Sequence, residues 1–156
     1  MVTAWVTNGT TTLEAIVNPI NAACHKGFVP DRLYIIENPK VTDEVARAVD
    51  LATEIVDAYG GDELDVRTTS IESELDFDRL YAHTRESIEA VHEDDGEVAV
   101  DFTPGRKFMS ALAFATGMRY DADHVYYFYL EDTPRGRLYP SIPRTKSCLY
   151  DFTEVL

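Results

Sequence analysis

The chain has 156 residues, a length that fits one domain with a substantial core. Hydrophobic residues make up 45% of it, which excludes an intrinsically disordered chain. The 28 acidic residues against 14 basic ones give a formal net charge of -14, and such a surface repels phosphates, which excludes duplex DNA as an expected partner.

The composition also bears on where the protein works. Dense carboxylates with few lysines are typical of proteins from salt-loving organisms, and we expect a halophilic archaeon, because carboxylates keep a surface hydrated in concentrated salt. The N-terminal segment lacks the basic start and long apolar core of a signal peptide, and no segment has the length of a membrane span. We therefore predict a soluble, cytoplasmic protein without a membrane partner.

The cysteines and histidines give no sign of a metal site. Cys24 and Cys148 lack metal-type spacing, so we predict two reduced, packed thiols. The histidines are scattered, and we expect them on the surface or at helix ends; they are His25, His83, His92 and His124. The sequence therefore predicts neither a metal nor a cofactor.

Strands and helices are predicted to alternate from the N-terminus onward. The β-rich run at 2–7 ends in a polar stretch at 8–12, and residues 13–27 have helical apolar spacing despite Pro19. A second strand is predicted at 31–38. The chain thus opens with a strand, a polar loop, a helix and a strand.

Two more helices follow in the middle of the chain. The amphipathic segment 41–61 predicts a helix with Thr42 as its N-cap and Gly60 as its stop. A third strand at 63–71 then precedes a third helix at 77–93.

The fourth pair and the fifth strand complete the alternation. They are predicted at 97–103, 107–120 and 123–131. The aromatic run from Tyr126 to Tyr129 in the fifth strand is interpreted as core, because a central parallel strand is expected to be apolar throughout.

This pattern predicts an α/β fold, a Rossmann-like three-layer sandwich with a mainly parallel sheet. The last β-like run, at 146–152, follows several turn residues and predicts an antiparallel hairpin at one edge of the sheet. We expect one domain at 1–156, with a β-α core at 1–130 and a C-terminal tail at 131–156.

Basic residues are concentrated late in the chain. Residues 105–156 hold seven bases and six acids, whereas 1–104 are strongly acidic. This asymmetry favours either a pocket for a small anionic ligand or a face that meets a partner subunit, and the two interpretations have equal weight. The seven bases are Arg106, Lys107, Arg119, Arg135, Arg137, Arg144 and Lys146.

Two loops have the chemistry of a ligand site, since open α/β sheets bind ligands beyond the carboxyl ends of their strands. In the first loop, Asn8, Thr10 and Thr11 supply amide and hydroxyl groups, and Gly9 lets the backbone approach a ligand.

The second loop, which opens the fourth helix, has the chemistry of an anion site. Arg106 and Lys107 add positive charge where the helix already presents unpaired N–H groups. Asp101 is expected to hold the loop through backbone N–H groups, and Thr103 to cap the turn or donate to a phosphate.

The stretch "DFTPGRKFMSALA" at 101–113 resembles the D-x-T-G-G-T-K-x-M-S/A motif of CARF domains, the CRISPR-associated Rossmann-fold sensors. The matching residues are Asp101, Thr103, Gly105, Lys107 and Met109. Pro104 and Arg106 depart from the glycine and threonine that are usual in the family.

The resemblance implies a homodimer that binds a cyclic oligoadenylate across its two-fold axis in type III CRISPR antiviral signalling. The residues expected to line this site are Asn8, Gly9, Thr10, Thr11, Thr103, Gly105, Arg106 and Lys107. CARF domains usually precede a nuclease or a DNA-binding module, and this chain has room for neither. We therefore expect a stand-alone sensor, with a separate effector protein as a possible partner.

Two other functions stay open. A metal-independent ring nuclease would cleave the messenger by in-line attack of a ribose 2′-OH, with Lys107 and Arg106 stabilising the phosphorane and Thr10 orienting the attack. A Rossmann-like domain could instead bind another nucleotide or serve as an interaction module. Tyr139 and Tyr150 are candidates for flanking adenine rings in the messenger interpretation.

Overall fold

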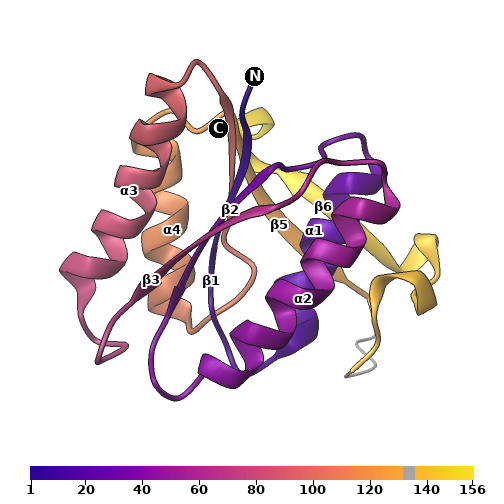
Figure 1. The fold of residues 1–156 in the computed structure, drawn as a ribbon, viewed down its shortest axis with the longest axis horizontal. Helices are drawn as coiled ribbons and strands as arrows, with labels where there is room; N and C mark the ends of the chain where they lie inside the picture. Colours follow the sequence, from indigo (N-terminus) through magenta and orange to yellow (C-terminus); the bar gives the residue numbers. More distant parts are fainter. Residues whose placement is uncertain (132–135) are drawn as a thin grey trace.

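The structure is a computed structural model, and it describes residues 1–131 and 136–156. Its centre is a six-stranded sheet with the order β3-β2-β1-β4-β5-β6 (Figure 1). The strands are β1 (Thr3–Asn8), β2 (Arg32–Glu37), β3 (Asp65–Ser70), β4 (Glu97–Asp101), β5 (His124–Leu130) and β6 (Ser147–Asp151).

Four helices cover the sheet in two layers (Figure 1). They are α1 (Leu13–His25), α2 (Thr42–Ala58), α3 (Phe77–Glu93) and α4 (Lys107–Arg119). The helices α1 and α2 pack together on one side, and α3 and α4 on the other. Neighbouring strands from β3 to β5 are parallel, and β6 is antiparallel to β5. This is the predicted Rossmann-like three-layer sandwich with an antiparallel C-terminal edge.

The central strands form because their residues are apolar on both faces. In β1, Ala4 and Val6 face α3 and α4, whereas Trp5 faces the opposite layer, where its ring stacks on that of Tyr126 at 5.6 Å between centroids. Burial on both faces is what a parallel strand between two helical layers requires.

Hydrogen bonds hold the C-terminal tail against α1, and two of them are made by one asparagine. Asn18 Nδ2 donates to the carbonyl oxygen of Arg137 at 2.9 Å, and Asn18 Oδ1 accepts from the backbone N–H of Tyr139 at 2.9 Å. Because Asn18 is buried, both bonds are protected from water, and they hold the segment before β6 against the helix.

Two sequence predictions about helix residues are wrong: Thr42 is not the N-cap of α2, and His83 is neither on the surface nor at a helix end. The N-cap of α2 is Val41, and Thr42 is the first helical residue, with its Oγ1 donating to the carbonyl oxygen of Asn38. His83 lies in the interior of α3 and is buried, because its ring bonds to β1 and β3 beneath the helix.

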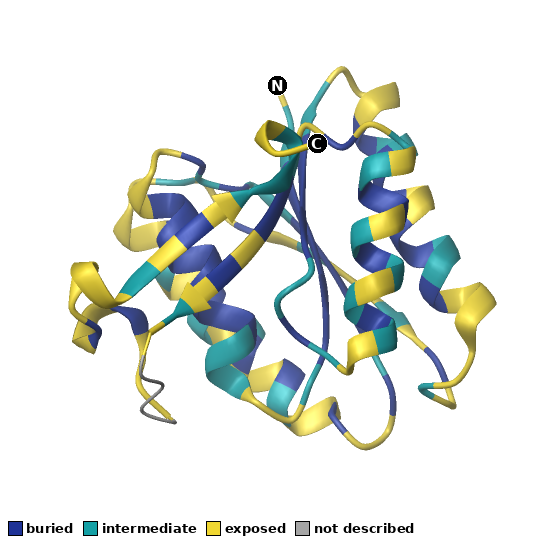
Figure 2. Ribbon diagram, turned by 180° about the vertical axis from the view of Figure 1, so that it is seen from behind, coloured by how far each residue is buried: buried dark blue, intermediate teal, exposed yellow. Residues whose placement is uncertain are grey.

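The fifth strand and the second cysteine also differ from expectation. Tyr126 and Phe128 are buried as predicted, but Tyr127 and Tyr129 are exposed. Their side of β5 faces the α3–α4 layer, and that layer ends at α4 (Figure 2). Cys148, on the neighbouring β6, is exposed for the same reason, whereas Cys24 is buried and its burial raises the pKa of the thiol to about 12.

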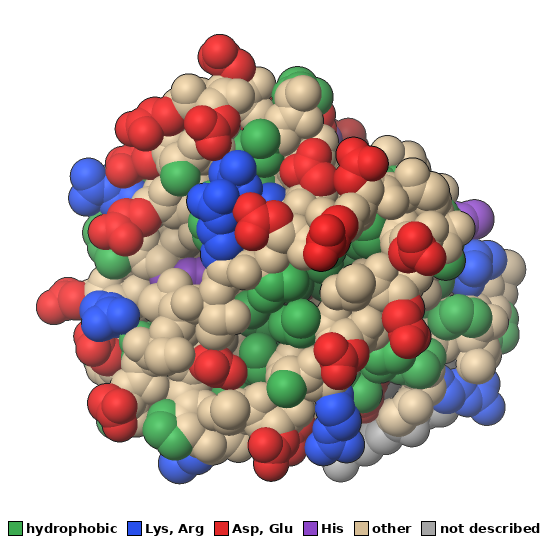
Figure 3. Space-filling view, in the orientation of Figure 1, with side chains coloured by type: hydrophobic (Ala, Val, Ile, Leu, Met, Phe, Trp, Pro, Cys, Tyr) green, Lys and Arg blue, Asp and Glu red, His purple; other side chains and the backbone are tan. Residues whose placement is uncertain are grey.

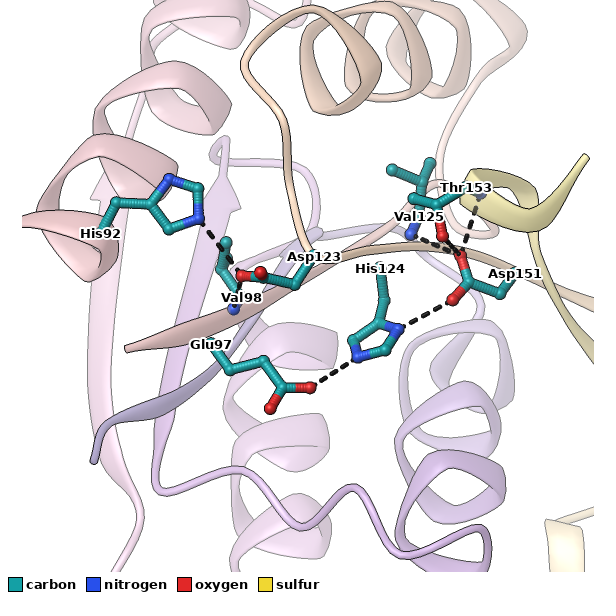
Figure 4. A network of polar contacts seen from close by, with 8 residues as sticks. All are labelled: His92, Glu97, Val98, Asp123, His124, Val125, Asp151 and Thr153. Carbon is teal, nitrogen blue, oxygen red and sulfur yellow. Dashed lines mark hydrogen bonds and ion pairs between the residues drawn. The ribbon is translucent and has the colours of Figure 1, made fainter. Parts of the chain in front are cut away.

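A charged network fastens the end of the sheet where β4 and β5 begin and β6 ends (Figure 4). His124 contacts Glu97 through Nε2 at 2.6 Å and Asp151 through Nδ1 at 2.8 Å. Ionised carboxylates only accept hydrogen bonds, so the imidazole donates from both nitrogens as a cation. Burial lowers the pKa of His124, but the bonds to Asp151 and Glu97 outweigh it and raise the pKa overall.

We expect this network to make stability depend on pH. Because the folded-state pKa of His124 is raised, its contribution is complete below the unfolded value of about 6.5 and is lost as pH rises through the folded-state pKa. His124→Gln should lower the free energy of unfolding by about 1 kcal/mol near pH 5, a modest figure because Glu97 is partly exposed. Urea unfolding from pH 5 to pH 9 measures the difference, and a deficit that does not shrink with rising pH contradicts the ionic role.

Candidate functional site

The candidate site lies where the strand order reverses. The strands β1 and β4 are neighbours, yet β1 leads into α1 on one side of the sheet and β4 leads into α4 on the other. The loops 9–12 and 102–106 therefore emerge side by side at the carboxyl ends of these strands, which is where α/β sheets bind ligands.

A hollow of about 290 Å³ opens between these loops and the loops that follow β2 and β3. Its lining residues are Gly9, Thr10, Thr11, Asn38, Lys40, Val41, Glu74, Gly105, Arg106 and Met109. The structure thus brings together five of the eight predicted ligand residues: Gly9, Thr10, Thr11, Gly105 and Arg106.

Asn8 and Gly9 support the first loop from below. Asn8 is buried, and the backbone N–H of Gly9 already donates to the carbonyl oxygen of Ile36 at 2.7 Å. A Cβ atom on Gly9 would lie 2.7 Å from the same oxygen, so glycine is required for the close packing of β1 on β2. The N–H of Gly9 is thus used within the sheet, although Gly9 still lines the hollow, and its role in letting the backbone approach a ligand stays a prediction. Thr10 and Thr11 are the more accessible groups of this loop.

Asp101 and Thr103 shape the second loop. Asp101 is fully buried, accepts from the Thr103 backbone N–H at 2.9 Å as predicted, and accepts from Thr7 Oγ1 at 3.3 Å. Burial raises the pKa of this carboxyl to about 7, although the bonds from Thr103 and Thr7 act in the opposite direction. Thr103 Oγ1 accepts from the Phe128 backbone N–H at 2.9 Å, so its hydroxyl is turned toward β5 and away from the hollow.

The two adjacent cations have different surroundings. Arg106 is the N-cap residue of α4, and its Nε lies 2.9 Å from Glu74 Oε2 in the loop after β3. Lys107, the first residue of α4, is exposed and forms no ion pair within residues 1–131 and 136–156. The Arg106 side chain makes no capping hydrogen bond, and within the described ranges no side chain is seen to accept from the first N–H groups of α4, so these groups and the Lys107 ammonium can meet an anion.

The left-handed backbone at Gly105 makes this geometry possible. Its φ is +103°, a conformation that favours glycine, and it turns the chain into the helix. A Cβ there would also lie 3.2 Å from the Cβ of Met109, which packs under the turn.

A chain of buried polar groups runs beneath both loops. His83 Nε2 donates to the carbonyl oxygen of Thr7 at 3.1 Å, and the Thr7 hydroxyl in turn donates to Asp101 Oδ2 at 3.3 Å. Burial lowers the pKa of His83 to about 4, although the bond to Thr7 opposes this, so the ring is neutral at pH 7. These groups are covered by protein and serve to position the loops.

The other late cations do not gather at this site. Arg119 lies at the far end of α4, Arg137 lines a separate hollow beside β5, and Arg144 packs 4.1 Å from the Tyr139 ring centroid. Arg135 lies outside the described residues. Figure 3 shows acidic side chains spread over one face of the molecule, with fewer basic ones among them. The positive charge near the hollow is therefore local.

Sequence reasoning missed three side chains of the hollow. Asn38 and Lys40 come from the loop after β2, and Glu74 comes from the loop after β3.

The two tyrosines predicted to flank adenine rings lie away from the hollow. Tyr139 is buried against Phe128, so it is not accessible to a ligand, and Tyr150 lies on β6, outside the hollow. Within the described part of the chain, no three His, Cys, Asp or Glu side chains are grouped as metal ligands, and no helix is long and apolar enough to cross a membrane.

No protein-family model and no curated protein sequence matches the chain. Solved structures do share its fold. Can2 from Sulfobacillus thermosulfidooxidans, in complex with cyclic tetra-adenylate, is 17% identical over 79% of this chain and 31% of its own, with a TM-score of 0.55.

Two further solved structures give the same result. Enterococcus italicus Csm6, bound to cyclic hexa-2′-fluoro-hexa-dAMP, is 12% identical over 88% of this chain and 35% of its own, with a TM-score of 0.61. A type III CRISPR defence DNA nuclease activated by cyclic oligoadenylate is 15% identical over 84% of this chain and 19% of its own, with a TM-score of 0.56. The chain spans about a third or less of these proteins, and the likeness establishes the fold.

Proposed function

We propose that the chain is a CARF-like sensor that binds a cyclic oligoadenylate at a dimer interface in type III CRISPR signalling. The observation that carries the proposal is that Gly105 and Arg106, at the start of α4, line one hollow with Thr10 and Thr11, while the next residue, Lys107, is exposed and forms no ion pair within residues 1–131 and 136–156. The motif at 101–113 and the fold shared with oligoadenylate-bound proteins support it.

The chemistry of the site suits a small anionic ring. Phosphate oxygens would accept from the first N–H groups of α4 and from the hydroxyls of Thr10 and Thr11, with Lys107 supplying full positive charge. In molar salt the Debye length is about 3 Å, so the carboxylates elsewhere on the surface repel a ligand at this site only weakly. A local cationic pocket therefore lets a strongly acidic protein bind a polyphosphate ring.

Binding is the first proposal, and cleavage of the ring is the alternative. The titratable groups beneath the loops, Asp101 and His83, are buried, and Glu74 is engaged by Arg106. General acid–base catalysis requires a group within reach of the proton that moves. A sensor that acts through a separate effector protein fits these features, and cleavage by Lys107, Arg106 and Thr10 is the outcome that would replace it.

The test is to titrate the protein with cyclic tetra-adenylate and cyclic hexa-adenylate in molar KCl by calorimetry, and to chromatograph the recovered nucleotide. Linear tetra-adenylate is the matched control. We expect saturable binding of one ring, weak or no binding of the linear form, and intact recovered ligand. Linear products would identify a ring nuclease, and no binding of either ring would refute the messenger proposal.

A further inference from the structure

One wall of the hollow between the ligand loops carries a negative charge of the protein's own. Glu74 lies in the segment 71–76, which joins β3 to α3, and its Oε2 is 2.9 Å from Nε of Arg106. Both residues line the hollow, because α3 and α4 begin at the same end of the sheet (Figure 1). The arginine that a ligand phosphate would meet is therefore already paired with a carboxylate.

This ion pair is open to exchange. The side chains of Arg106 and Glu74 are 63% and 22% exposed, and a hydrogen bond from Nε joins them. Within residues 1–131 and 136–156, the Nη1 and Nη2 groups of Arg106 have no hydrogen-bond partner. A phosphate accepts two parallel N–H bonds from a guanidinium, and this bidentate contact is stronger than a single bond. An anion that enters the hollow can thus take Arg106 from Glu74.

Glu74 and a ligand phosphate cannot share this arginine without a cost in free energy. The hollow has a volume of about 290 Å³, so a phosphate bonded to Arg106 would face the Glu74 carboxylate at short range. Two negative groups repel each other, and the repulsion is stronger beside protein than in bulk water. The carboxylate and the phosphate are therefore alternative partners of one guanidinium.

We infer that Glu74 is an internal competitor of the anionic ligand, which binds by displacing the Glu74 carboxylate from Arg106. The inference rests on the proposed function, since it concerns the same site. The apparent affinity equals the intrinsic affinity multiplied by the fraction of molecules in which Arg106 is free. Glu74 therefore sets the ligand concentration at which the site fills, and it keeps Arg106 from anions that bind too weakly to displace a carboxylate.

Displacement of the carboxylate also releases the segment 71–76. The hydrogen bonds in the middle of this segment are local: the Ser73 side chain accepts from the Leu75 N–H at 3.1 Å, and its carbonyl oxygen accepts from the Asp76 N–H at 3.1 Å. Among the described residues, the pair with Arg106 is the one ion pair that ties this segment to the start of α4. Ligand binding should therefore loosen the segment and speed hydrogen exchange at these two amides.

The test is to titrate the full chain with cyclic tetra-adenylate and with inorganic pyrophosphate in molar KCl, followed by amide NMR at Gly105 and Lys107. Glu74→Gln is compared with Glu72→Gln, because both changes remove one negative charge from the same segment, whereas Glu72 is exposed and does not line the hollow. An exposed ion pair is weak, so we expect Glu74→Gln to bind both anions about three- to tenfold more tightly than the wild type. Glu72→Gln should bind them as the wild type does. Damage to the loop would weaken binding, so a gain cannot come from misfolding.

A double-mutant cycle with Arg106→Gln separates displacement from repulsion at a distance. The gain from Glu74→Gln should largely disappear beside Arg106→Gln, because no arginine is left to release. In hydrogen exchange, either anion should move the wild-type rates at Leu75 and Asp76 toward the faster rates of ligand-free Glu74→Gln. Equal or weaker binding by Glu74→Gln, a gain that persists beside Arg106→Gln, or exchange rates that neither anion changes would overturn the inference.

The two anions separate this inference from the proposed function. Pyrophosphate binding that Glu74→Gln strengthens, without binding of the cyclic messenger, would uphold the competitor and refute the proposed function. Cyclic tetra-adenylate binding with equal affinity in the wild type and Glu74→Gln would uphold the proposed function and overturn the competitor. Both are refuted if neither protein binds either anion.

Discussion

Lys107→Glu is expected to abolish binding of cyclic tetra-adenylate while leaving the fold slightly more stable. The substitution replaces the one cation at the start of α4 that has no ion pair within residues 1–131 and 136–156. A hydrogen bond to a charged group contributes about 1.5–3 kcal/mol, and reversal of the charge adds repulsion, so we expect at least a hundredfold loss of affinity. An acidic residue in the first turn stabilises a helix by about 0.3–1 kcal/mol, so unfolding should not explain the loss.

Arg119→Glu is the matched control, because it makes the same charge change at the other end of the same helix. Calorimetry on both variants measures affinity, and urea unfolding measures stability. Binding should survive in Arg119→Glu with less than a threefold change. Equal losses in the two variants would mean that overall charge, and not a site at the start of α4, determines affinity.

Asp101→Asn is expected to stabilise the protein at neutral and alkaline pH. The carboxyl of Asp101 is fully buried and its pKa is raised from 3.8 to about 7. The folded state therefore holds its proton over a range in which the unfolded chain has lost it, and stability falls as pH rises from about 4 to about 7. Asparagine keeps the shape and the acceptor for Thr103 N–H without a charge to bury.

The gain of Asp101→Asn should depend on pH in a defined way. At about 1.36 kcal/mol per pKa unit, the variant should exceed the wild type by up to about 4 kcal/mol above pH 7 and by little near pH 4. Urea unfolding at pH 4, 6 and 8 measures this difference. A gain that is the same at all three pH values, or a less stable variant at pH 8, would show that ionisation of the buried carboxyl does not destabilise the folded state.

The alternation of strands and helices was predictable because the central parallel strands β1, β2 and β4 are largely apolar runs and the helices α1, α2 and α3 have amphipathic spacing. The bounds of α3 in the structure, Phe77–Glu93, are those that its spacing predicts. The exposure of Tyr127 and Tyr129 was not predictable, since it depends on where the layer of α3 and α4 ends and not on β5 itself.

The candidate site was predictable only as far as its two loops. Their residues are local in sequence, so Thr10, Thr11 and the start of α4 could be found from polar residues at strand ends. The ion pair between Arg106 and Glu74 joins residues 32 positions apart in different β-α units, and no spacing rule connects them. Likewise, the use of Gly9 in packing β1 against β2 follows from the strand order.

The number of cyclic tetra-adenylate rings bound per chain, measured by calorimetry in molar KCl, tests the central claim most directly. The account predicts one ring per two chains, because under the proposed function the loops of two copies meet at a dimer interface to hold one symmetric ligand. One ring per chain would mean that a single hollow suffices and that the dimer is not part of the site. No binding would contradict the account altogether.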